Sequence, residues 1–320
     1  MNNVLLSVKD LAITFNSKEG MVRAVDGISF DLMEGEIFAL VGESGCGKST
    51  TALGLMRLIP EPGKINQGEI IFEGQDLMKL KEKEMPSIRG KSIGMIFQNP
   101  LDSLNPVYSI GRQVAEGLVI DKMPKREAWE KAIEVFGDVK ISDAHQRVGN
   151  FPHELSGGMR QRVMIGMMLS RNPKLLIADE PTTALDVTIQ AQILELLKEL
   201  RAKLNTSILV ITHDFGIVAE IADRVGVMYA GKMVEIGDVY EIFENPIHPY
   251  TKLLMKALPR ITKSQGRLET IPGSVPDLTN PPEGCRFYNR CPVAEEICAS
   301  QEPAFFEVKK GHICACHKEE

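Results

Sequence analysis

The sequence of 320 residues lacks any hydrophobic run long enough to cross a lipid bilayer. Its longest apolar stretches, such as 163–169 and 207–212, are far shorter than the roughly 20 residues of a membrane helix. It also lacks a basic start followed by a long apolar stretch, which argues against a secretory signal. A basic surplus is missing too, and the net charge of −6 argues against a general nucleic-acid binder. If the protein works at a membrane, other chains must supply the spans.

Cysteine is scarce over most of the chain and concentrated at its end. Cys46 is the only one before residue 285. Because no export signal is present, disulfide bonds are a poor explanation for the terminal group, and a metal site is a better one. The terminal cysteines are Cys285, Cys291, Cys298, Cys314 and Cys316.

The hydrophobic pattern predicts an α/β fold. Alternation of apolar and polar residues indicates half-buried antiparallel strands, and short continuous apolar runs indicate parallel strands buried on both faces. A loop-rich segment punctuated by prolines follows residue 258. The predicted elements are a hairpin at 4–15 and 25–32, strands at 37–41, 175–178 and 208–211, helices at 50–58 and 189–204, a helical segment at 101–151, and a hairpin at 224–236.

Residues 42–50 read Gly-Glu-Ser-Gly-Cys-Gly-Lys-Ser-Thr and fit the phosphate-binding pattern G-x-x-x-x-G-K-[ST] between a strand and a helix. Glycines let the backbone wrap the phosphates, Lys48 can neutralise the β- and γ-phosphates, and the Ser49 hydroxyl can hold Mg²⁺. We interpret Cys46 as a small loop residue rather than a nucleophile. The residues expected to bind the nucleotide in this loop are Gly42, Ser44, Gly45, Gly47, Lys48, Ser49 and Thr50.

Residues 175–180 read Leu-Leu-Ile-Ala-Asp-Glu, so a second apolar strand ends in two carboxylates. Such a pair often only prepares the start of a helix for its dipole. The phosphate-binding loop upstream favours a metal and base role instead. We therefore expect Asp179 to reach Mg²⁺ and Glu180 to polarise the attacking water.

Residues 155–162 read Leu-Ser-Gly-Gly-Met-Arg-Gln-Arg, directly ahead of a helical apolar pattern. Backbone N–H groups at a helix start, with the Ser156 hydroxyl beside them, make an anion site. An ordinary N-cap with a glycine turn is the alternative. The loop at 42–50 is already a better phosphate site, so a second anion site in the same chain is expected to serve another purpose.

These motifs and four further positions make residues 4–258 resemble the ATP-binding cassette (ABC) ATPases. Gln98 looks like the Q-loop glutamine, which links Mg²⁺ and water to the helical subdomain, and His213 resembles the switch histidine that contacts the γ-phosphate. Asp186 resembles the D-loop aspartate at the dimer interface, and Phe15 is expected to stack on adenine. The resemblance implies Mg²⁺ bound through Ser49, Gln98 and Asp179, and catalysis by Glu180, His213 and Gln98.

The resemblance also implies the architecture. A P-loop NTPase cassette would cover 1–258, with a mixed sheet, an antiparallel β subdomain and a helical subdomain inserted at about 101–165. A small metal-binding extension would cover 259–320. In this family the run that corresponds to residues 155–162, here called the signature run, contacts ATP held by a partner cassette. The ATP site is therefore complete only when two cassettes close. The residues that match those partner contacts are Ser156, Gly157, Gly158 and Asp186.

The last segment resembles the C-terminal extension of oligopeptide and dipeptide importer ATPases, in which four cysteines ligate a [4Fe–4S] cluster. The spacing is C-x5-C-x6-C-x17-C, and thiolates are the usual ligands of such clusters. The resemblance implies Cys285, Cys291, Cys298 and Cys316 as ligands, while the extra thiol of Cys314 leaves the fourth position open. Zinc or free thiols are the alternatives, although C-x2–4-C zinc spacing is absent.

Residues 245–254 read Asn-Pro-Ile-His-Pro-Tyr-Thr-Lys-Leu-Leu and are similar to the segment that closes the cassette in peptide and nickel importers. Because it precedes a proline, His248 is expected to serve as a cap or turn residue rather than as a metal ligand.

The sequence therefore predicts the ATP-hydrolysing subunit of an importer of dipeptides or oligopeptides, with ATP, Mg²⁺ and a [4Fe–4S] cluster as cofactors. The expected partners are a paralogous cassette (a homodimer is the alternative), two integral membrane permease subunits and, indirectly, an extracytoplasmic solute-binding protein, with no nucleic acid. The expected location is peripheral, on the cytoplasmic face of the cell membrane. The alternatives are an importer of nickel or another small solute, and a soluble ABC ATPase outside transport.

Overall fold

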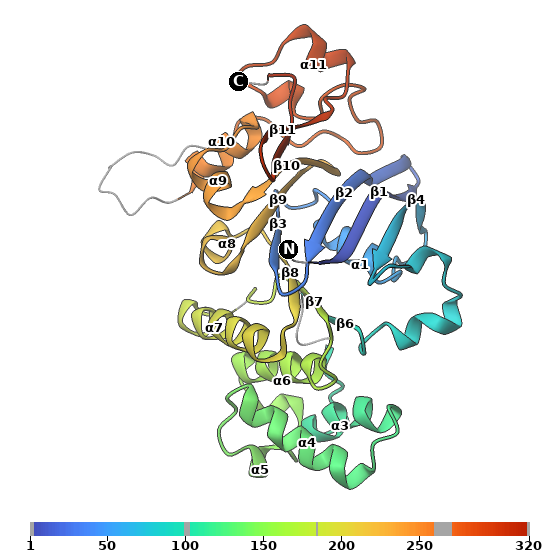
Figure 1. Cartoon of the computed structure of the whole chain (residues 1–320), viewed down its shortest axis with the longest axis vertical. Coiled ribbons are helices and arrows are strands. Elements are labelled where there is room, and N and C mark those ends of the chain that lie inside the picture. The colour runs from blue at the N-terminus through green and yellow to red at the C-terminus, as the bar shows by residue number, and fades with distance from the viewer. Residues whose placement is uncertain (1–2, 99–102, 184, 259–270, 319–320) are drawn as a thin grey trace. The chain divides into compact units, whose positions relative to one another are not determined.

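The computed structural model describes residues 3–98, 103–183, 185–258 and 271–318 (Figure 1). The chain divides into two compact units. The first comprises Met1–Met33, Ile37–Met78 and Thr212–Glu320, and the second comprises Glu34–Glu36 and Lys79–Ile211. The described residues do not include the first residues of the predicted helical subdomain (101–102) or of the predicted extension (259–270). The domain boundaries drawn from the sequence stay predictions.

An antiparallel sheet opens the first unit. Strands β1 (Val4–Ser17) and β2 (Gly20–Met33) form the predicted hairpin. Strands β4 (Gly63–Phe72) and β5 (Gln75–Asp76) follow in the order β2-β1-β4-β5, with η1 (Leu77–Lys79) after them. The hydrophobic pattern missed β4 because polar residues and glycines interrupt its apolar ones and only two of its side chains are buried.

The first unit also holds part of a second sheet. The predicted strand β3 (Ile37–Val41) runs parallel to β9 (Arg224–Tyr229), which forms the predicted hairpin with β10 (Lys232–Asp238). Helix α1 (Lys48–Leu55) follows β3 and begins two residues before the predicted 50–58. The remaining helices of this unit are α8 (Phe215–Ile221), α9 (Val239–Glu244), α10 (Pro249–Ala257), η4 (Tyr288–Arg290) and α11 (Glu296–Ser300).

The C-terminal segment is more ordered than the predicted loop-rich appendage. Strands β11 (Phe305–Lys309) and β12 (His312–Ala315) form a hairpin, and β12 pairs with β10, so the strand order is β11-β12-β10-β9-β3 (Figure 1). Phe287 is buried in one hydrophobic cluster with Tyr229 and Tyr250. The segment therefore shares a core with the cassette strands.

The second unit contains parallel strands and a group of helices. Strands β6 (Ile93–Ile96), β7 (Leu175–Asp179) and β8 (Ser207–Thr212) lie in the order β8-β7-β6, and α7 (Val187–Leu204) makes the predicted crossover between β7 and β8. Helices α3 (Ile110–Ile120), α4 (Lys125–Asp138) and α6 (Gly157–Leu169) pack together (Figure 1). Short helices η2 (Glu82–Ser87), α5 (Ala144–Arg147) and η3 (Pro152–Glu154) complete it.

The helical prediction for 101–151 is confirmed at residues 103–151, which contain no strand. In the part of the chain that the structure describes, no helix has the length and apolarity needed to cross a membrane.

Candidate functional site

The glycines of the phosphate-binding loop are required by its backbone. Gly42, Gly45 and Gly47 have φ of 150°, 79° and 105°, in the region that favours glycine. A Cβ at Gly42 would lie 2.1 Å from the carbonyl oxygen of Met228, and one at Gly47 would lie 2.3 Å from that of Ala24. The loop therefore turns tightly between β3 and α1, as the pattern predicts.

Lys48 is held inside this loop. Its Nζ donates to the carbonyl oxygens of Gly42 at 2.8 Å and Glu43 at 3.0 Å, and the residue is only 6% exposed. Ser44 and Gly45 are exposed, and Ser49 and Thr50 are half-buried.

Cys46 belongs to the phosphate-binding loop. It is buried, and burial raises the pKa of its thiol, which keeps it protonated at neutral pH. This agrees with its interpretation as a small loop residue rather than a nucleophile.

Two other predicted nucleotide contacts belong to the first unit. His213 directly follows β8 and is exposed. Phe15 is half-buried in β1, where a Cβ at Gly63 would lie 2.5 Å from its ring. Their contacts with phosphate and adenine stay predictions.

The second unit brings Gln98 and Glu180 together. Nε2 of Gln98 donates to Oε2 of Glu180 at 2.7 Å, and the Thr183 hydroxyl donates to the same oxygen at 2.9 Å. Asp179 is the buried last residue of β7, and Glu180 follows it with φ of 46°. A left-handed backbone is uncommon for glutamate, and such positions cluster at functional sites. No sequence pattern pointed to Thr183.

The backbone N–H of Glu180 donates to the carbonyl oxygen of Ile211 at 2.8 Å. This bond fixes the backbone of the turn after β7, and the bonds from Gln98 and Thr183 orient the carboxylate.

The signature run begins α6 with Ser156 as its N-cap, and the Ser156 hydroxyl accepts a hydrogen bond from the N–H of Met159 at 3.3 Å. The capping role that the alternative interpretation assumed is therefore present. A Cβ at Gly158 would lie 2.7 Å from the Ile189 side chain, whereas one at Gly157 would meet only Leu185, at 3.7 Å. A side chain at position 157 would therefore project into largely open space.

Asp186 has a local role as the N-cap of α7. Its carboxylate accepts a hydrogen bond from the N–H of Ile189 at 3.0 Å. The predicted contact with a partner cassette is not tested by this bond.

Four of the terminal cysteines line one small cavity, namely Cys285, Cys291, Cys298 and Cys316. The cavity has about 10 Å³ of room, close to that of one water molecule. Cys314 is not among the lining residues. It lies buried in β12 opposite Glu235.

Burial raises the pKa of the Cys285 thiol to about 11 and also raises those of Cys291 and Cys316. Within the described ranges, no group of three or more His, Cys, Asp or Glu side chains is arranged to hold a metal ion. Four thiols of the kind that bind iron–sulfur clusters line one cavity, but they are not in ligating positions. The iron–sulfur cluster stays a prediction.

The capping role predicted for His248 is confirmed. Its Nδ1 accepts a hydrogen bond from the N–H of Tyr250 at 3.1 Å, and Pro249 takes the first position of α10. Burial lowers the pKa of His248 to about 4, so the ring is neutral and free to accept at this nitrogen.

Comparison with known proteins decides the family. Residues 25–183 match the model of the ABC transporter family, and residues 234–298 match that of the oligopeptide/dipeptide transporter C-terminal region. The chain is 55% identical over 311 residues to the oligopeptide transport ATP-binding protein OppD of Bacillus subtilis, covering 96% of this chain and 87% of that protein. The chain belongs to the ATP-binding subunits of oligopeptide and dipeptide ABC importers. It is an ABC-type ATPase.

Other relatives agree with this family. The dipeptide transport ATP-binding protein DppD of Bacillus subtilis is 49% identical, with 98% of this chain and 94% of that protein covered. Among solved structures, the dimeric post-hydrolysis state of the ATP-binding cassette MJ0796 bound to ADP and Pi superposes with a TM-score of 0.66 at 27% identity. It covers 73% of this chain and 98% of that one.

Proposed function

We propose that this subunit binds MgATP with its phosphate-binding loop and that a second cassette closes over this ATP with its own signature turn. The observation that carries the proposal is the open face of Gly157 at the start of α6, beside the exposed Ser156. Helix-start N–H groups attract a phosphate, and this turn has room for one supplied from outside the chain. The similar cassette MJ0796 forms a dimer with bound ADP and Pi, which supports pairing of two cassettes.

Within each site, every group has one role. Lys48 neutralises the phosphates, while Ser49, Gln98 and Asp179 hold Mg²⁺, and Glu180 accepts a proton from the water that attacks the γ-phosphorus. His213 contacts the γ-phosphate, and Phe15 stacks on adenine. The contacts to the partner's ATP come from Ser156, Gly157, Gly158 and Asp186. Loss of the γ-phosphate removes the bridge, and the cassettes separate.

The partner cassette is a paralogous chain, and two integral membrane permease subunits carry the peptide across the membrane. An extracytoplasmic solute-binding protein delivers it. The subunit acts at the cytoplasmic face of the membrane. The names of its relatives, which are oligopeptide and dipeptide transport ATP-binding proteins, support the role in peptide transport on which these partners depend.

The [4Fe–4S] cluster is held by the four cysteines that line one cavity, Cys285, Cys291, Cys298 and Cys316. A set of four thiolates is the usual ligand set of such a cluster. When bound, it would cross-link the segment that carries these residues.

The test of the dimer uses Glu180→Gln, which removes the base and preserves the ATP-dependent contact. We expect this variant to associate with the co-expressed partner cassette when MgATP is added, and Ser156→Arg to abolish the association because a long cation blocks the turn. Mass spectrometry of the complex identifies the partner chain. Association that is independent of ATP, or unchanged by Ser156→Arg, would refute the proposal.

A further inference from the structure

An arginine of the C-terminal segment reaches the phosphate-binding loop. Nη1 and Nη2 of Arg290 donate to the two carboxylate oxygens of Glu43 at 2.9 and 3.1 Å. Glu43 is the second residue of the loop and Arg290 ends η4, so the contact joins parts of the chain 247 residues apart. A bidentate pair of this kind fixes both side chains in one geometry.

The arginine is rigidly held on the segment's side. Its Nε donates to the carbonyl oxygen of Pro272 at 2.9 Å, Nη1 donates to the Tyr229 hydroxyl at 3.2 Å, and the guanidinium lies over the Phe287 ring. The Arg290 side chain is 5% exposed and that of Glu43 is 25% exposed, so solvent screens the pair less than a surface pair. Because these contacts already hold the Arg290 side chain, pairing with Glu43 costs it little further conformational entropy.

Glu43 also belongs to the network that holds the lysine of the loop. Its carbonyl oxygen accepts the hydrogen bond from Nζ of Lys48, and its N–H donates to the Tyr250 hydroxyl at 3.0 Å. A movement of Glu43 would therefore move an acceptor of the residue that neutralises phosphate.

A carboxylate in a phosphate-binding loop is electrostatically unfavourable, because it repels the anion that the loop must bind. The guanidinium of Arg290 neutralises that charge. Cys291 directly follows Arg290 in the sequence. The N–H of Arg290 donates to the carbonyl oxygen of Phe287, and this short turn positions the guanidinium.

We propose that Arg290 is a positioning residue for ATP binding, by which the C-terminal segment neutralises Glu43 and fixes the phosphate-binding loop. The proposal rests on the assignment of this loop as the nucleotide site. It gives the segment a function in the ATPase cycle, in addition to any cofactor bound by its cysteines.

The test measures the Kd of MgATP in full-length Glu180→Gln protein, and KM and kcat in the otherwise wild-type chain. Arg290→Met is expected to raise Kd and KM on the order of tenfold, with kcat within about twofold, because an unpaired Glu43 carboxylate then repels the nucleotide. Arg290→Lys, which keeps the charge and loses the fork, is expected to fall between. Glu43→Gln together with Arg290→Met is expected to recover most of the affinity.

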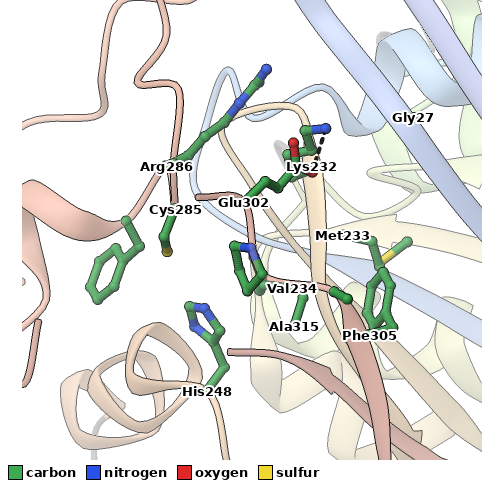
Figure 2. A pocket seen from close by; sticks show the side chains of 14 residues that line it. Gly27, Lys232, Met233, Val234, His248, Cys285, Arg286, Glu302, Phe305 and Ala315 are labelled. Carbon is green, nitrogen blue, oxygen red and sulfur yellow. Dashed lines mark ion pairs between the residues drawn. The ribbon is translucent and has the colours of Figure 1, made fainter. Parts of the chain in front are cut away.

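The matched control is Glu302→Gln. Figure 2 shows Glu302 of the same segment paired with Lys232 of β10, beside a cavity of about 200 Å³, and the two side chains are 2.6 Å apart. This variant loses an anchor of the segment without touching the loop. Its Kd is expected to equal that of the wild type.

Wild-type affinity in Arg290→Met would overturn the inference, as would a double variant as weak as the single one. If Arg290→Met does not fold, wild-type affinity in Arg290→Lys serves as the contradicting result. Lys48→Ala distinguishes a failure of the nucleotide-site assignment from a failure of the role proposed for Arg290. If it binds ATP normally, the nucleotide site itself is misassigned, whereas loss in Lys48→Ala alone refutes only the role of Arg290.

Discussion

Gln98 donates a hydrogen bond to the carboxylate of Glu180 across 2.7 Å, and Thr183 donates to the same oxygen. The second carboxylate oxygen takes no part in these two bonds. Two donors on one oxygen orient the carboxylate. An oriented carboxylate is a more effective acceptor for the proton of an attacking water, which is the role proposed for Glu180.

Replacing Glu180, the proposed base, is expected to stop hydrolysis without stopping binding. Glu180→Gln keeps the shape of the side chain but cannot accept the proton, so we expect kcat to fall by about 10²–10⁴-fold, with Kd for MgATP changed by less than about threefold. Steady-state phosphate release and equilibrium nucleotide binding measure the two effects. The control is Glu199→Gln, which alters only an exposed pair with Lys140. Retained hydrolysis in Glu180→Gln would assign the base to another residue.

Thr183 is expected to matter for the same step. Thr183→Val preserves the shape and removes the donor, so we expect kcat to fall by about tenfold with KM unchanged, since a hydrogen bond to a charged group is worth about 1.5–3 kcal/mol. Single-turnover hydrolysis is the measurement. A change in KM alone would place Thr183 in nucleotide binding rather than in the orientation of the base.

The two glycines of the signature run are expected to respond differently to alanine. In Gly158→Ala the new Cβ meets Ile189, and overpacking is expected to lower the free energy of unfolding by about 1–3 kcal/mol. In Gly157→Ala stability is expected to stay within about 0.5 kcal/mol, while ATP-dependent association with the partner cassette weakens. Urea unfolding and size-exclusion chromatography distinguish them. Equal stability of both variants would contradict the packing of α6 on α7.

The cavity separates the roles of two neighbouring cysteines. Anaerobically purified wild-type protein is expected to contain iron and sulfide and to show a broad visible absorption band. Cys316→Ser is expected to lose most of both, whereas Cys314→Ser is expected to keep them, because Cys314 does not line the cavity. Zinc in place of iron, or equal loss in both variants, would contradict the proposed ligand set.

The ion pair between Asp121 and Arg171 makes a pH-dependent contribution to stability. Two donors of Arg171 lie 2.6 Å from the two Asp121 oxygens, and this hydrogen bonding lowers the pKa of the carboxyl. A depressed carboxyl pKa adds stability above the usual aspartate range, and that stability is lost as the pH falls. Asp121→Asn is expected to cost up to about 1 kcal/mol at neutral pH.

Urea titrations at several pH values test this expectation. The difference between Asp121→Asn and the wild type should close as the pH drops below about 4. Glu130→Gln, which removes an exposed helical pair with Arg126, serves as the control. A difference that stays constant with pH would mean that the variant acts through packing.

Motifs made of consecutive residues were readable from the sequence because their interactions are local. Lys48 bonds to carbonyl groups five and six residues before it, and Ser156 caps an N–H three residues after it. Such contacts follow from spacing and backbone preference alone. The same holds for the His248 cap and the hairpin turn at Ala230 and Gly231, where φ is 48° and 82°.

The tertiary structure decided what depends on distant neighbours. No sequence pattern predicts that Glu43 contacts Arg290 or that β12 pairs with β10. These residues are far apart in the chain and come into contact only when it folds. The structure likewise shows that Cys316, and not Cys314, lines the cavity with the other three cysteines, while the identity of a fourth ligand stays a prediction. Cys314 lies buried inside β12, whereas Cys316 follows the end of the strand and lines the cavity. The sequence alone determined the local chemistry, and the fold alone determined the long-range contacts of the C-terminal segment.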